Sequence, residues 1–139
     1  IGTAESCTGG LVAGRLTTVP GSSDVFRGGL VAYDNGVKEA VLGVPADLIG
    51  AHGAVSAEVA AAMAHGARER LGVDVAVSVT GIAGPGGGTP EKPVGLVFFH
   101  VAGPMGEKAF RFELPGDREV IRSRCTVAAL HLVRRLLEP

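Results

Sequence analysis

A serine stands in the middle of the segment AESCTGG at residues 4–10, where a predicted strand turns into a predicted helix. In open α/β sheets, ligands bind outside the carboxyl ends of strands, and a helix start offers unpaired N–H groups with a partial positive charge. Ser6 is therefore a candidate nucleophile, with backbone donors for an oxyanion and with Gly9 and Gly10 to admit a substrate. The plainer alternative is that Ser6 or Thr8 only caps the helix.

A serine nucleophile needs a base, and no His and Asp stand in a recognisable triad arrangement here. Lys38 is one of only three lysines and follows Tyr33, the only tyrosine, by five residues. We expect both to follow a strand that ends beside the first one. Burial can lower the pKa of a lysine from ~10.4, and serine–lysine pairs are a known variant of the triad. The alternative is an exposed Lys38 on a short helix, with Tyr33 as an ordinary strand aromatic.

A second glycine-rich turn, TGIAGPGGGT at residues 80–89, follows another predicted strand. Backbone amides in such a loop can hold an anion, although a flexible surface loop has the same composition. Near the C-terminus, Arg118 and Arg122 open the last predicted helix. Either guanidinium can hold a phosphate, and the alternative is a solvated helix face.

The elements that must position these residues alternate between strands and helices in the first half of the chain. Helix signals include Ser56 as N-cap and Gly72 as stop, and residues 73–80 alternate valine with smaller residues. The predicted strands are 1–5, 26–33, 73–80, 95–102 and 107–114, and the predicted helices are 11–18, 35–42, 45–51, 56–71 and 117–137. This order predicts one three-layer α/β/α domain with helices on both faces of the sheet. Residues 95–114 read as a hairpin, so the sheet is predicted to be mixed rather than wholly parallel.

Composition excludes several classes of protein. The 139 residues are 46% hydrophobic and 19% charged, with a formal net charge of -1, which is typical of a compact globule and gives no electrostatic case for nucleic acid or an anionic membrane. No apolar run approaches the ~20 residues that span a bilayer. The two cysteines favour a reduced, cytoplasmic setting. The four histidines show no metal-ligand spacing, so we expect scattered structural or surface histidines and no metal or other cofactor.

Taken in order, the motifs resemble one known family, the CinA carboxy-terminal domain, which also occurs alone as a nicotinamide mononucleotide deamidase. The resemblance runs over nearly the whole chain, although the family's usual helix before the first strand is missing, so residues 1–139 resemble an N-terminally trimmed copy of that domain. It is carried by AESCTGG at 4–10, Tyr33 with Lys38, GAVS at 53–56, TGIAGPGGG at 80–88 with KPVG at 92–95, and GDR at 116–118.

The resemblance implies hydrolysis of the nucleotide's carboxamide to nicotinic acid mononucleotide and ammonia. The family's roles fall on Ser6 as nucleophile, Lys38 as base and Tyr33 as proton relay or orienting group. Residues expected around the substrate are Cys7, Thr8, Gly9, Gly10, Thr80, Gly81, Gly84 and Arg118.

The resemblance also implies a small-molecule partner, a homodimer, and relatives fused to an amino-terminal nucleotide pyrophosphatase domain. Two alternatives from other classes stay open. One is a non-catalytic nucleotide-binding regulatory module, which has no use for Lys38. The other is an interaction domain connected with DNA uptake or repair, against which the near-neutral charge speaks.

Overall fold

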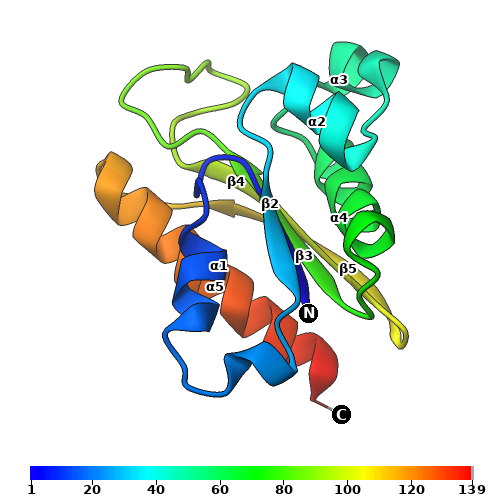
Figure 1. Ribbon diagram of the computed structural model, residues 1–139. Helices are drawn as coiled ribbons and strands as arrows, with labels where there is room; N and C mark the ends of the chain where they lie inside the picture. Colours follow the sequence, from blue (N-terminus) through cyan, green and yellow to red (C-terminus); the bar gives the residue numbers. More distant parts are fainter. Residues whose placement is uncertain (139) are drawn as a thin grey trace.

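The five strands form one mixed sheet in the order β2-β1-β3-β4-β5, in a computed structural model that describes residues 1–138 (Figure 1). Helices cover both faces, which confirms the predicted three-layer α/β/α class. The elements are β1 (Gly2–Glu5), α1 (Leu11–Thr17), a 3-10 turn (Ser22–Asp24), β2 (Gly28–Val31), α2 (Asn35–Leu42), α3 (Ala46–His52), α4 (Ala57–Leu71), β3 (Ala76–Gly81), β4 (Leu96–Gly103), β5 (Gly106–Glu113) and α5 (Arg118–Leu137).

Strand direction changes once across the sheet. β1 pairs in parallel with both β2 and β3, whereas β4 pairs antiparallel with β3 and β5. The register places Glu5 opposite Val31 on one side and Val79 on the other. The carboxyl ends of β1, β2 and β3 therefore meet at one edge, so the segments that follow them are neighbours.

Two hydrophobic clusters fill the space on either side of the sheet. One lies under α1 and α5 and includes Val77, Phe99 and Ile121, while the other lies under α2 and α4 and includes Leu42 and Met63. Figure 1 shows α1 and α5 on one face, with α2, α3 and α4 on the other. Val77 and Val79 of β3 enter the first cluster and Ala76 enters the second, so the strand is buried on both faces from Ala76 to Thr80.

A glycine sets how closely α2 approaches α4. A Cβ built on Gly66 would overlap the carbonyl oxygen of Leu42 at the end of α2. Only glycine permits that contact, and the same helix α2 carries Lys38. The approach of α2 to α4 thus fixes the height of Lys38 above the sheet edge.

Most predicted boundaries lie within a few residues of the observed ones. Ser56 caps α4 by accepting from the N–H of Val59, which confirms the predicted N-cap. Asp117, predicted as the first residue of the last helix, is its N-cap and accepts from the N–H of Val120. The strand predicted at 26–33 is shorter at both ends because β2 is an edge strand that pairs only with four-residue β1. Pro45 is the N-cap of α3 rather than its first residue. Within residues 1–138, no helix has the length and apolarity to cross a membrane.

Candidate active site

Ser6 lies in the turn that connects β1 to α1, at the edge where the parallel strands end. Its backbone N–H donates to the carbonyl of Val79, which continues the β1–β3 ladder by one residue, and its own carbonyl accepts from Gly9 N at 3.0 Å. Only 8% of the residue is exposed. The main chain at Ser6 is therefore held on both sides, and the residue lines a cavity together with Lys38.

Glu5, not Ser6 or Thr8, satisfies the start of α1. The buried Glu5 carboxylate accepts from the backbone N–H groups of Gly10, Val12 and Ala13 at 3.2, 2.9 and 3.0 Å. The N-cap position is Gly10, at φ 104°, where no side chain caps the helix. The capping alternative for Ser6 and Thr8 is therefore wrong, and the Ser6 hydroxyl is available for another role. An acidic residue just before a predicted helix start is the sequence signal that could have found this arrangement.

Lys38 meets Ser6 across the sheet edge. Its Nζ lies 3.0 Å from Ser6 Oγ and 3.2 Å from the carbonyl oxygen of Tyr33. The residue is 1% exposed, so the alternative of a solvated lysine is wrong. Asp34 starts α2 by accepting from Gly36 N, and the one-turn spacing then turns Lys38 inward.

Burial lowers the pKa of Lys38 below its ordinary value, while the nearby Asp34 carboxylate and Cys7 oppose the shift. A lysine with a lowered pKa has more of its neutral form at a given pH, and the neutral amine is the form that accepts a proton. A hydroxyl within hydrogen-bond distance of a desolvated amine is the arrangement of a serine–lysine nucleophile.

Tyr33 and Arg118 connect the Lys38 segment to the glycine loop. Arg118 donates to the Tyr33 hydroxyl at 3.1 Å and to the carbonyl of Gly84 at 2.9 Å. Within residues 1–138 the Tyr33 phenol makes no hydrogen bond to Ser6 or Lys38. Tyr33 contacts the lysine through its backbone carbonyl instead. The geometry thus favours an orienting role for Tyr33 over a relay through its hydroxyl.

The glycine loop after β3 closes another side of the site. Thr80 is buried and donates to the carbonyl of Ala54 at 2.8 Å, which ties the strand end to the start of α4. A Cβ on Gly81 would lie 2.8 Å from Leu96 O, and Gly84 adopts φ 79° with Val94 against it. These glycines are used for close packing of the loop on β4, and not simply for flexibility.

A cavity of about 210 Å³ joins most of these residues. Of the predicted site residues, it brings together Ser6, Cys7, Tyr33, Lys38, Thr80, Gly81 and Arg118. It also includes Asn35, Ala54, Val55 and Ala83, which sequence reasoning did not assign to the site, although Ala54 and Val55 fall in the GAVS motif at 53–56. A larger hollow of about 550 Å³ between α1 and α5 contains neither Ser6 nor Lys38.

The remaining predicted contacts lie beside the cavity rather than in its wall. Thr8 is fully buried, and Arg122 donates to the carbonyls of Cys7 and Thr8 at 3.1 and 3.2 Å. Arg122 therefore holds the turn, which leaves Arg118 as the guanidinium that lines the cavity. Gly9 and Gly10, at φ 59° and 104°, shape the turn.

Cys7 and Cys125 are both reduced and buried behind the turn. A hydrogen bond from the Cys125 thiol lowers the pKa of Cys7, and the same contact together with burial raises the pKa of Cys125. Cys7 contributes to the core under α5 as well as to the cavity wall.

Comparison with known proteins gives a consistent set of relatives. The family model described as the CinA C-terminal domain matches residues 1–137. A CinA-like protein of Mycolicibacterium paratuberculosis is 60% identical over 99% of this chain, and a putative competence-damage inducible protein of Symbiobacterium thermophilum is 56% identical over 99%. The chain spans about a third of the length of these curated relatives, 33% and 34% respectively.

Solved structures agree in fold. The crystal structure of a competence/damage inducible protein from Agrobacterium tumefaciens superposes with a TM-score of 0.96 at 45% identity, covering 99% of this chain and 84% of that one. A competence-damaged protein superfamily member from Escherichia coli gives a TM-score of 0.93 at 33% identity, covering 97% and 78%.

Proposed function

The chain belongs to the CinA C-terminal domain family, and from that premise we propose that it is an amidohydrolase that converts nicotinamide mononucleotide to nicotinic acid mononucleotide and ammonia. The observation that carries the proposal is the 3.0 Å contact between Lys38 Nζ and Ser6 Oγ, both buried at the strand ends. A non-catalytic nucleotide-binding module has no need of a desolvated lysine on a serine hydroxyl, because burying an amine costs free energy.

In the first half of the reaction, Ser6 Oγ attacks the carboxamide carbon while its proton moves to neutral Lys38. The carbonyl oxygen becomes an oxyanion, for which the N–H groups of Cys7 and Thr8 are the nearest donors, since the N–H of Ser6 is already bonded to Val79. Lys38 then passes the proton to the amide nitrogen, the C–N bond breaks and ammonia leaves. The nicotinoyl group remains as an ester on Ser6.

In the second half, water attacks the ester carbon and gives one proton to Lys38. The ester bond breaks and Ser6 Oγ regains that proton. The acid product leaves, and its carboxyl group releases the second proton of the water to solvent. The Tyr33 carbonyl orients Lys38 throughout, and Arg118 holds the Tyr33 phenol and the Gly84 carbonyl at the cavity wall.

The cavity supports a small planar carboxamide better than a whole enclosed nucleotide. At about 210 Å³ it is below the ~300 Å³ at which clefts for larger ligands begin. We therefore place the pyridine carboxamide inside, with the ribose and phosphate toward solvent. Arg118 is the cation of the cavity wall that the phosphate can reach.

The test is ammonia release from nicotinamide mononucleotide by the purified protein. Ser6→Ala should lower turnover by several orders of magnitude and leave the fold intact, because removal of the nucleophile leaves only binding and oxyanion stabilisation. Cys7→Ala is the matched control and should keep most of the activity. If Cys7→Ala is inactive and Ser6→Ala is active, the nucleophile is Cys7 and the assignment of Ser6 is wrong.

Other outcomes select the alternatives. Binding of the mononucleotide without ammonia release points to a regulatory nucleotide-binding module, and no binding at all points to an interaction domain. The homodimer is also proposed here and is tested by light scattering of the purified chain. A cytoplasmic setting and fusion to an amino-terminal pyrophosphatase domain stay predictions.

A further inference from the structure

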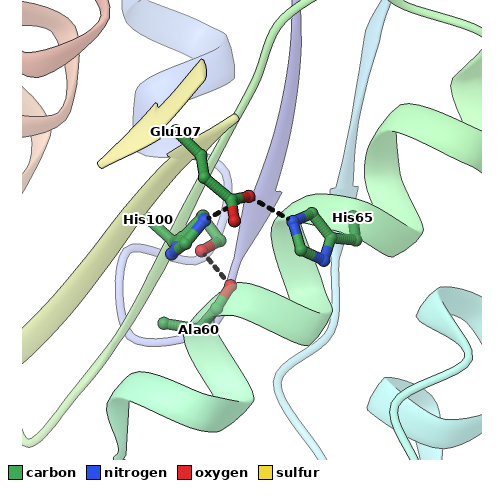
Figure 2. Close-up of polar contacts among 5 residues, drawn as sticks. Ala60, His65, His100 and Glu107 are labelled. Carbon is green, nitrogen blue, oxygen red and sulfur yellow. Dashed lines mark hydrogen bonds and ion pairs between the residues drawn. The ribbon is translucent and has the colours of Figure 1, made fainter. Parts of the chain in front are cut away.

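A second polar cluster lies between α4 and the β4–β5 hairpin (Figure 2). Glu107 Oε2 is 2.6 Å from His65 Nε2 and 3.1 Å from His100 Nε2. The two imidazole rings meet edge to face with centroids 5.5 Å apart. One ligand-type atom from each of the three residues lies within 4.8 Å of the other two. Two imidazoles and a carboxylate thus converge on one point.

The fold assembles this cluster from residues with no common motif. His100 pairs with Ala109 in the β4–β5 ladder, and Glu107 lies two residues from Ala109, hence on the same face and diagonal to His100. That face lies under α4, where the buried Ser78 hydroxyl of β3 donates to the carbonyl of Ala60 at 2.5 Å. The contact holds α4 against the sheet one turn before His65, which brings His65 over the hairpin.

We propose that His65, His100 and Glu107 bind one divalent transition-metal ion of the zinc type, at a site separate from the Ser6–Lys38 cavity. Two imidazoles and one carboxylate are a ligand set found for Zn²⁺, with a remaining position open to water. Imidazole nitrogen favours Zn²⁺, Ni²⁺ or Cu²⁺ over Mg²⁺ and Ca²⁺, which prefer oxygen ligands. The cavity around Ser6 contains none of these three residues, so the two sites stand or fall independently.

The distances fit an ion after a small movement of exposed side chains. Zinc bonds of ~2.0–2.2 Å place neighbouring ligand atoms a little over 3 Å apart in a tetrahedron. The His100 pair with Glu107 is already at 3.1 Å, whereas the His65 pair, at 2.6 Å, must open slightly. His65 and Glu107 side chains are 53% and 52% exposed and free to rotate, while His100, at 8%, is the fixed ligand.

Charge and protons also balance. Glu107 Oε2 already contacts both imidazoles, so this oxygen faces the point where an ion would sit. Each neutral imidazole frees Nε2 for the ion by moving its proton to Nδ1, and no proton is lost overall. Nδ1 of His100 is buried with no hydrogen-bond partner within residues 1–138, so it can take the proton without breaking a contact to the protein.

A bound ion would join α4 to the hairpin. His65 lies on α4, whereas the other two ligands belong to β4 and β5. The segment before α4 carries Ala54 and Val55, which line the Ser6 cavity. The expected consequence is a more stable domain and a more firmly held cavity wall, because an ion that binds only the folded chain stabilises it.

The test is a titration of the metal-free protein with ZnCl₂ by calorimetry, together with thermal unfolding. We expect one Zn²⁺ per chain and a rise in Tm of several degrees at a zinc concentration ~100-fold above Kd. Glu107→Gln and His65→Ala should each weaken binding by at least the ~10–100-fold that loss of a supporting partner costs. His131→Ala, an exposed histidine on α5, is the matched control and should bind as the unaltered protein does.

A second measurement does not depend on variants. In the unaltered protein, NMR signals of the His65 and His100 rings should shift on addition of zinc and stay in place on addition of MgCl₂. The proposal is overturned by zinc that fails to bind at one ion per chain, by affinity unchanged in both Glu107→Gln and His65→Ala, or by ring signals that do not respond.

Discussion

Ser6 and Lys38 meet at the edge where the parallel strands end. His65 lies on α4, and His100 and Glu107 lie on the antiparallel β4–β5 hairpin (Figure 2). The first pair is 8% and 1% exposed. In the second group only His100 is buried, and the side chains of the other two are about half exposed, at 53% and 52%. Both regions place polar side chains within hydrogen-bond distance of one another, but only in the first are all of these side chains removed from water.

The difference separates two ways of using a polar contact. At the strand edge, desolvation itself changes the chemistry, because it lowers the pKa of Lys38 toward the range where an amine accepts protons. At the hairpin, solvent keeps the contacts weak and the side chains adjustable, which suits an arriving ion. Substitutions at the strand edge should therefore have large effects on turnover or stability, and those at the hairpin small ones unless metal is present.

The largest expected effect comes from Lys38. Both Lys38→Ala and Lys38→Arg should lower kcat for nicotinamide mononucleotide by several orders of magnitude, because guanidinium stays charged and cannot accept the serine proton. Steady-state kinetics measures this, with Lys108→Arg as the exposed control on β5. If Lys38 only attracts the phosphate, Lys38→Arg will instead keep its kcat and raise KM.

The pH profile gives the next largest effect. The active form has neutral Lys38, so the rate should rise about tenfold per pH unit and level off above an apparent pKa below the ordinary ~10.4. The free energy of unfolding should also rise with pH. Above the unfolded-state pKa of Lys38 its burial costs nothing in protonation, and as pH falls from there toward the lowered folded-state pKa the folded state loses stability. A rate independent of pH between pH 6 and 9 would remove Lys38 from proton transfer.

A stability effect of intermediate size is expected at Glu5. Glu5→Ala leaves the buried N–H of Val12 and the partly buried N–H groups of Gly10 and Ala13 without this acceptor. An unpaired buried N–H costs about 1–3 kcal/mol, so the unfolding free energy should fall by about 2 kcal/mol or more. Glu5→Gln keeps one oxygen for Gly10 and Val12 and should cost less. Urea unfolding measures both. Metal-free Glu107→Ala is the comparison at the hairpin, and an equal loss there would contradict the contrast in burial.

The smallest expected effect is that of a chelator on turnover. The cavity residues offer Cys7 but no histidine or carboxylate, so EDTA treatment should leave ammonia release unchanged. The same treatment should lower the Tm of zinc-loaded protein through the hairpin site. Activity that is lost on EDTA treatment and restored by zinc or magnesium would mean that the two regions are not independent.

Much of the candidate site could be predicted because local patterns carry it. A strand followed by a polar turn and a helix placed Ser6 at a strand end, and valine alternation identified β3, whose glycine loop adjoins it. Parallel strands end at one edge, so their loops had to be neighbours. The role of Glu5 was missed because it depends on where three N–H groups of the next helix point.

The sequence by itself determined the order of strands and helices and the cap at Ser56, because these follow from periodicity and from short-range hydrogen bonding. It also made Ser6 and Lys38 candidates, through their residue types and their places after predicted strands. Only the tertiary structure decided that Lys38 is buried on Ser6, that Arg118 faces the cavity while Arg122 holds the turn, and that His65 meets the hairpin. Those contacts join residues far apart in the chain, and their distances depend on sheet register and on the close packing of α2 and α4 at Gly66.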